Sequence, residues 1–123
     1  MDLRSTLKAL CDAFNAHDLD RIMGFFAEDC VLEMPRGANP WGTRSVGKAA
    51  VRRALAARFE GLPDVKYGED EHFVDAAANT GMSKWRLTGT TPEGARKDVC
   101  GCDFYTFRDG KVIRKDSYWK IVG

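Results

Sequence analysis

The sequence predicts an α+β fold in which helices pack on one face of a curved, mainly antiparallel sheet. Three observations support this prediction. Three segments in the first half of the chain carry apolar side chains at helical spacing. A short strand-like segment separates the second of these from the third. The residues after Pro63 then form four strand-like runs divided by turn signals, so that helices and sheet make two layers of one domain.

The first helix is expected to begin after Asp2, a possible N-cap, and to end at the turn Asn15–His17. Its apolar face comprises Leu3, Leu7, Leu10, Cys11 and Phe14. A second helix follows Asp18, and its apolar face comprises Leu19, Ile22, Met23 and Phe26.

Residues 30–34 form a short expected strand that Pro35 ends. The stretch from Pro35 to Gly47 is expected to be a loop that contains Trp41 and is long enough either to be functional or to serve as an ordinary crossover. The third helix is expected to begin at Ser45 or Gly47 and to end at residues 61–63.

Four strands are expected over residues 65–75, 81–90, 97–108 and 111–121. Turn signals separate them at residues 79–81, 91–94 and 109–110. The Asp109–Gly110 pair is the clearest hairpin signal in the chain.

Length and composition bound the function. The 123 residues are 44% hydrophobic, 11% aromatic and 30% charged, which predicts one domain over 1–123. The net charge of +1 gives no field to hold nucleic acid or an anionic membrane, so neither partner is expected. No apolar run is long enough to span a bilayer and the N-terminus lacks a secretion signal, so we expect a cytoplasmic protein.

Four cysteines lie in apolar segments without the spacing of a disulfide framework: Cys11, Cys30, Cys100 and Cys102. This pattern favours reduced core thiols. No second Cys/His pair at zinc spacing accompanies Cys100 and Cys102, and no glycine-rich nucleotide motif is present, so neither a metal nor a cofactor is expected.

Four segments in this order resemble the SnoaL-like branch of the nuclear transport factor two superfamily: Phe14–Asp20, Phe25–Val31, Val46–Val51 and Phe104–Val112. The resemblance covers nearly the whole chain. It implies a cone-shaped, cystatin-like α+β fold with three helices, a pocket for a small molecule and a homodimer formed through the outer sheet face. The superfamily includes isomerases, epoxide hydrolases, dehydratases, polyketide cyclases and non-catalytic binding proteins, so the resemblance does not fix an activity.

Alternation along the strands predicts which side chains line such a pocket. If Asp103 faces inward, so do Gly101, Tyr105 and Phe107, whereas Cys100 and Cys102 face outward. The expected ligand-binding residues are Met34, Trp41, Phe59, Trp85, Leu87, Lys115, Ser117 and Trp119.

Asp103 is the leading catalytic candidate, with Tyr105 beside it. Two alternatives are open for Asp103. Burial in an apolar strand raises the pKa of a carboxyl, and a neutral acid can donate to an oxyanion, as the resemblance to the isomerases implies for this position. Alternatively, Asp103 is a carboxylate paired with Lys115 or an arginine.

The resemblance fails at the other catalytic positions. Met34 stands where the isomerases carry their general base, and Leu10 falls near their oxyanion-site tyrosine. The epoxide hydrolase set maps near Lys84, Arg86 and Ser117, which lack its two carboxylates. Glu33 is expected on the face opposite Met34.

His72 remains as a general-base candidate if its face turns inward, and is otherwise a partly exposed strand histidine. The expected function is therefore binding of a small, mostly apolar molecule, with isomerisation, dehydration or cyclisation by proton transfer. The alternative is a non-catalytic ligand- or protein-binding homodimer, in which Trp41, Trp85 and Trp119 fill the cone.

Overall fold

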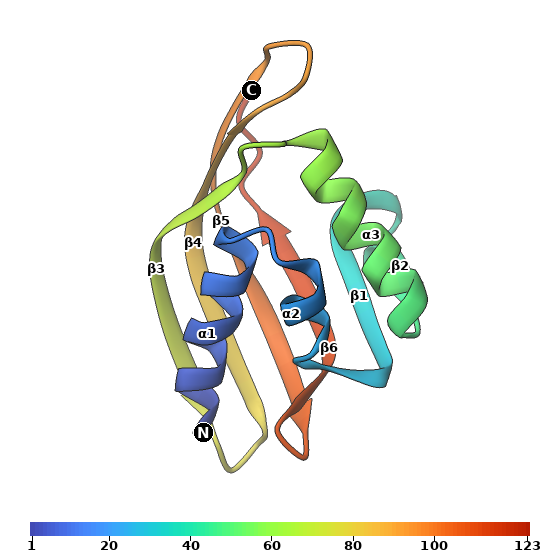
Figure 1. Ribbon diagram of the computed structural model, residues 1–123, viewed down its shortest axis with the longest axis vertical. Helices are drawn as coiled ribbons and strands as arrows, with labels where there is room; N and C mark the ends of the chain where they lie inside the picture. The colour runs from blue at the N-terminus through green and yellow to red at the C-terminus, as the bar shows by residue number, and fades with distance from the viewer.

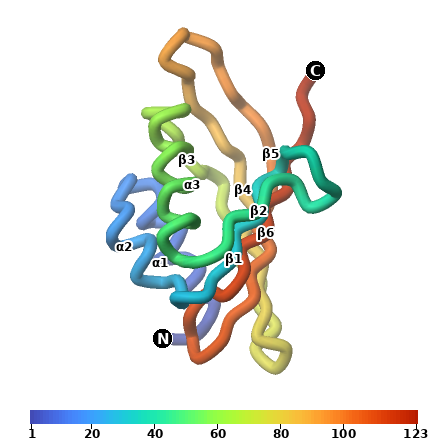
Figure 2. The backbone as a smooth tube through the Cα atoms, turned by 90° about the vertical axis from the view of Figure 1, so that its right-hand side faces the viewer, coloured from blue at the N-terminus to red at the C-terminus, as the bar shows by residue number.

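Three helices cover one face of a six-stranded sheet in the computed structural model, which describes residues 1–123 (Figures 1 and 2). The helices are α1 (Leu3–Asn15), α2 (Leu19–Met23) and α3 (Lys48–Gly61). The strands are β1 (Phe26–Asn39), β2 (Gly42–Val46), β3 (Lys66–Asp75), β4 (Thr80–Thr90), β5 (Arg96–Arg108) and β6 (Lys111–Trp119). The α+β prediction is confirmed.

The strand order in the sheet is β2-β1-β6-β5-β4-β3. Neighbours are antiparallel except for β1 and β6, which pair in parallel. This mixed, mainly antiparallel sheet is the predicted one. No helix is long and apolar enough to cross a membrane.

The first two helices begin directly after Asp2 and Asp18, the N-cap residues expected from the sequence. The backbone N–H of Ser5 donates to the Asp2 carboxylate at 2.8 Å, and that of Arg21 donates to Asp18 at 3.1 Å. The expectation that Phe26 lies on the second helix is wrong, because α2 ends at Met23 and Phe26 begins β1. The chain joins the sheet here instead of continuing the helix, because the N–H of Val112 on β6 donates to the Phe25 carbonyl at 2.9 Å.

The region around Pro35 differs most from the prediction. β1 continues through Pro35 to Asn39, and the expected loop contains β2, which pairs with β1 as a hairpin. Pro35 is tolerated because the register with β2 becomes irregular after Met34, and the pairing with β6 ends at Glu33. Helix α3 starts after Gly47, one of its two predicted starts.

The four C-terminal strands lie where they were predicted, within a few residues at each end. Asp109 and Gly110 have φ angles of 52° and 77°, as expected for a tight hairpin turn with two positive φ values. The β4–β5 ladder runs from Thr80 to Thr90 without a register shift. The side chains of β5 therefore alternate strictly beside β4.

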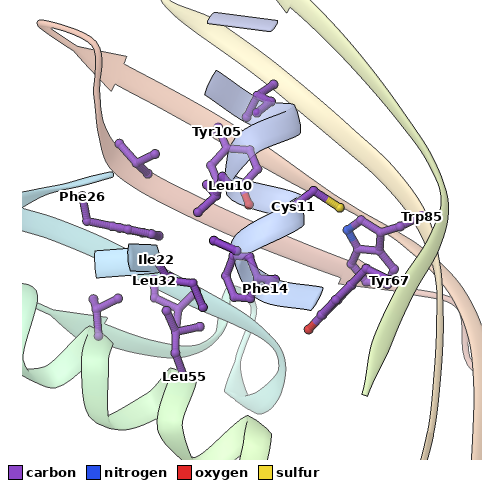
Figure 3. Close-up of a cluster of buried hydrophobic side chains, with 14 of the residues drawn as sticks. Leu10, Cys11, Phe14, Ile22, Phe26, Leu32, Leu55, Tyr67, Trp85 and Tyr105 are labelled. Carbon is purple, nitrogen blue, oxygen red and sulfur yellow. The ribbon is translucent and has the colours of Figure 1, made fainter. Parts of the chain in front are cut away.

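A core of 21 buried apolar residues fills the space between helices and sheet (Figure 3). All four cysteines are free. Cys11 and Cys30 are buried in this core, as expected. Cys102 is only half-buried and Cys100 is exposed, so the core assignment is wrong for these two, because alternation turns both to the outer face of the sheet.

Candidate functional site

A buried polar cluster lies at the centre of the cone, around Asp103 on β5. The Asp103 carboxylate accepts hydrogen bonds from Lys115 Nζ at 2.9 Å, Ser117 Oγ at 2.5 Å and Trp85 Nε1 at 2.9 Å. Lys115 Nζ also donates to Ser117 Oγ at 2.9 Å. All four residues are at most 6% exposed. We call these four residues the central cluster.

The geometry favours the second alternative for Asp103, the carboxylate paired with Lys115. Three donors converge on its two oxygens, and one of them is an ammonium, which is the environment of an ionised carboxylate. An ammonium has three N–H donors, and Lys115 uses two of them within the cluster. Lys115 is therefore the group with a donor to spare.

Two small cavities flank the central cluster. The first is lined by three members of the cluster, all but Ser117, and by residues of α1 and the sheet: Cys11, Phe14, Tyr67, Ser83 and Tyr105. The second lies toward Met34, Leu55, Arg58 and Trp119. Each measures about 10 Å³, the space of about one water molecule. Asp103, Lys115, Trp85 and Tyr67 line both, so the cluster stands between them.

A wider groove opens beyond the second cavity. It measures about 380 Å³ and shares Met34, Pro35, Ser117 and Trp119 with that cavity. Trp119 is half-buried between the two, and the guanidinium of Arg58 lies 4.5 Å from the centre of its ring. Movement of Trp119 and Arg58 would join the groove to the centre of the cone.

The tyrosines beside the cluster are protonated donors. Burial, and then the charge of Asp103, raise the pKa of Tyr105 well above its usual value. Burial likewise raises the pKa of Tyr67. Figure 3 shows both with Cys11, Phe14 and Trp85 between α1 and the sheet. Tyr105 can donate to a ligand but cannot act as a base.

The remaining predicted ligand-binding residues lie at different depths. Met34 lines the second cavity and the groove, as Trp119 does. Trp41 is 43% exposed, lies against Arg44 and lines only the groove. Leu87 and Phe59 line neither cavity, because Leu87 is fully buried in the core and Phe59 stacks on His17.

His72 is buried and forms a second polar chain that runs to the surface. Its Nδ1 lies 2.8 Å from Ser83 Oγ, and its Nε2 lies 2.7 Å from Asp70 Oδ2. Lys8 Nζ donates to the same Asp70 oxygen at 3.0 Å. Burial raises the pKa of Asp70, but the hydrogen bonds from His72 and Lys8 outweigh it and lower that pKa to about 2. Asp70 is therefore an ionised acceptor.

Cys11, Asp70 and His72 also place three potential metal ligands within 4.8 Å of one another. The arrangement fits a hydrogen-bonded chain better than a divalent cation. The Lys8 ammonium already occupies the Asp70 carboxylate. Burial, and then the charge of Asp70, raise the pKa of Cys11 to about 12, so its thiol is protonated.

Glu33 lies on the outer face, where alternation placed it. It is 4% exposed and is held by Arg44 and Arg114, so it cannot replace the missing base inside the cone. Sequence reasoning missed Ser83, Tyr67 and Arg58 as lining residues. Ser83 could have been found from its β4 position two residues before Trp85, which shares its face.

The helices cover one face of the mixed sheet, and the polar cluster lies between the helices and the sheet. This arrangement is a cystatin-like cone. The chain belongs to the family of the SnoaL-like domain, whose model matches residues 7–115. No curated protein sequence matches it.

Several solved structures share the fold. RV0760c from Mycobacterium tuberculosis, in complex with estradiol-17β-hemisuccinate, is 21% identical with a TM-score of 0.82, over 98% of this chain and 96% of that one. TerC, co-crystallised with polyporic acid, is 18% identical with a TM-score of 0.80, over 96% and 91%. A cystatin-like protein of unknown function from Xanthomonas campestris is 15% identical with a TM-score of 0.84, over 98% and 92%. At these identities the likeness shows the fold alone.

Proposed function

We propose that this protein binds a small, mostly apolar molecule that carries a carbonyl or hydroxyl oxygen, and acts on it by proton transfer as an isomerase, dehydratase or cyclase. The observation that carries the proposal is the Lys115–Asp103 ion pair at the centre of a mostly apolar cone. A buried ion pair adds little stability compared with apolar residues of similar size, so its presence there favours a role in binding or chemistry.

Lys115 gives the site its chemistry. Its remaining N–H can donate to a ligand oxygen, and its positive charge stabilises negative charge that develops there. Asp103 and Ser117 orient the ammonium, and Tyr105 supplies a second donor. This combination suits a carbonyl that becomes an enolate.

The ligand would enter from the groove beside Trp119. Because the two cavities are water-sized as they stand, binding requires Trp119 and Arg58 to swing outward, which joins the second cavity to the groove. It also requires the side chains between the two cavities to shift, which joins the first cavity to the second. The ligands of the two relatives, estradiol-17β-hemisuccinate and polyporic acid, are natural first probes together with the smaller 4-nitrophenol.

The test compares the thermal unfolding of the wild type with that of the double variant Asp103→Asn/Lys115→Met. A probe at about 100 times its dissociation constant adds about 2.7 kcal/mol of stability, which raises the unfolding midpoint of this domain by several degrees. We expect at least one probe to stabilise the wild type and Lys66→Gln, an exposed control on the edge strand β3, but not the double variant. An equal shift in all three proteins would contradict the site.

The small cavities also favour the second candidate, a non-catalytic homodimer whose cone is filled by Trp85 and Trp119. The outer sheet face supports the dimer itself. Phe73, Met82 and Phe104 lie side by side across β3, β4 and β5, and Phe73 and Phe104 are 51% and 43% exposed. Lys84 and Asp116 lie on the same face with opposite charges, which an interface with two-fold symmetry can pair.

Light scattering after size-exclusion chromatography tests the dimer. We expect twice the chain mass for the wild type and the monomer mass for Phe104→Glu, because a charge would be buried without a partner. Ala95→Glu in the β4–β5 turn is the matched control and should stay dimeric. A monomeric wild type would contradict the dimer.

A further inference from the structure

We propose that Ser83, His72 and Asp70 form a proton relay that takes a proton from the ligand at the centre of the cone and holds it on His72. This inference rests on the proposed function and names the base that it lacks. Met34 occupies the position where the related isomerases have their base, Lys115 is a donor, and both oxygens of the Asp103 carboxylate already accept hydrogen bonds within the central cluster. The relay supplies a base from the neighbouring strands, with Ser83 on β4 and His72 on β3.

Ser83 is the member of the relay that faces the ligand. It pairs with Asp103 across β4 and β5, is 4% exposed and lines the first cavity beside Asp103 and Lys115. The hydrogen bond to His72 is the one its side chain makes. A hydroxyl that donates in one direction keeps two lone pairs, which can accept a proton from the cavity.

The charge of Asp70 sets the tautomer of His72. An ionised carboxylate can only accept, so the Nε2 of His72 must carry the proton that lies between them. In the neutral imidazole Nδ1 is then unprotonated, and it accepts the hydroxyl proton of Ser83. The resting chain therefore points its basic nitrogen toward the cone.

The transfer balances without any other reactant. A proton leaves the ligand for Ser83 Oγ as the Ser83 hydroxyl proton moves to His72 Nδ1. The ligand keeps the electron pair as an enolate or phenolate beside the Lys115 ammonium, and His72 becomes an imidazolium beside the Asp70 carboxylate. Return of the proton to another ligand atom completes an isomerisation.

The far end of the relay opens to solvent. A groove of about 440 Å³ is lined by His72 and Asp70 together with the charged Arg4, Lys8 and Glu71. The groups that face His72 are Asp70 on its own strand, Lys8 and Cys11 on α1, and Ser83 on β4. Of these only Asp70 is an anion, and it stabilises the imidazolium that the transfer forms.

The probe for the relay is 4-nitrophenol, whose visible absorbance separates the neutral phenol from the phenolate. At a pH where the free probe is neutral, we expect the wild type to bind it as the phenolate. His72→Gln and Ser83→Ala should bind it as the neutral phenol, whereas Ser83→Thr, which keeps the hydroxyl, should restore the phenolate. Unfolding curves confirm that each variant is folded. An unchanged phenolate fraction in His72→Gln would overturn the relay.

Nitrogen NMR of the two histidines is independent of turnover. In the free protein we expect His72 to be protonated at Nε2 only, and at both nitrogens once the probe is bound. Asp70→Asn should move the proton of the neutral ring to Nδ1 when the amide donates to Nε2. His17, whose Nε2 lies 2.7 Å from the Val65 carbonyl, is the internal control and should not change.

The two proposals can fail separately. If 4-nitrophenol does not bind, the predicted binding of this probe fails. The relay is still tested, because the tautomer of His72 is measured in the free protein. A proton on Nδ1 in the free wild type would overturn it, because Ser83 would then accept from His72 rather than donate.

Discussion

Replacing Lys115 by methionine is expected to lower the free energy of unfolding by about 3 to 5 kcal/mol, the cost of leaving one charge of a buried pair without its partner. Methionine fills the space of the lysine stem, so the loss reports on charge rather than on volume. Asp103, 4% exposed, would keep only the hydrogen bonds from Ser117 and Trp85.

The double variant Asp103→Asn/Lys115→Met separates the cost of an unpaired buried charge from the net contribution of the ion pair. With both charges gone, no uncompensated charge remains, and most of the lost stability should return. Urea unfolding of the wild type, both single variants and the double variant measures this coupling. A Lys115→Met variant as stable as the wild type would show that Asp103 is not held as a buried carboxylate.

Replacing Gly101 by alanine is expected to cost about 2 to 3 kcal/mol or more, the upper range for overpacking. A Cβ at this position would lie 2.4 Å from the backbone oxygen of Tyr118 and 2.7 Å from the Trp85 ring. The strand β6 cannot retreat without breaking its ladder, and displacement of Trp85 removes a donor from Asp103. Thermal unfolding measures the loss, and the indole N–H signal of Trp85 reports the displacement.

Gly61→Ala is the matched control for this substitution. Gly61 is the last residue of α3, has a negative φ, and has open space where a Cβ would stand. Alanine there should leave stability unchanged or raise it by up to about 1 kcal/mol. Equal losses at Gly61 and Gly101 would show that the packing of Trp85 on Gly101 is not the cause.

The face of Asp103 could be predicted because the ladder between β4 and β5 is regular. Alternation then fixes Asp103 and Tyr105 on the inner face and Cys102 on the outer face. The hydrogen-bond partners of Asp103 were predictable only in part. Lys115 was named from the sequence. The donation from Trp85 was not, because it depends on the close approach of the Trp85 ring to Gly101, which no local sequence pattern encodes.

The surroundings of His72 could not be predicted, because a bulge interrupts β3. The register slips between Gly68 and Glu71, and Glu69 has a φ of 53°. Tyr67 and His72 both face inward as a result, although an odd and an even position would lie on opposite faces of a regular strand. Only the fold brings His72 to Ser83.

Pro35 misled the prediction for a related reason. A proline ends a strand when its missing N–H is needed by a neighbour. Here the ladders on both sides of β1 have already become irregular or ended, so the strand continues into the hairpin with β2. That hairpin carries Trp41 and Gly42 to the groove, outside the cone.

The central claim is that the ligand binds at the central cluster, in the merged space that runs from Trp119 to Ser83. The three tryptophans measure this directly, since Trp85 is buried in the cluster, Trp119 stands at its entrance and Trp41 is 43% exposed on the groove. The indole N–H signals should be followed by NMR during titration with 4-nitrophenol. We expect those of Trp85 and Trp119 to shift while that of Trp41 moves little. A shift of Trp41 with Trp85 unchanged would place the ligand in the outer groove and contradict the account.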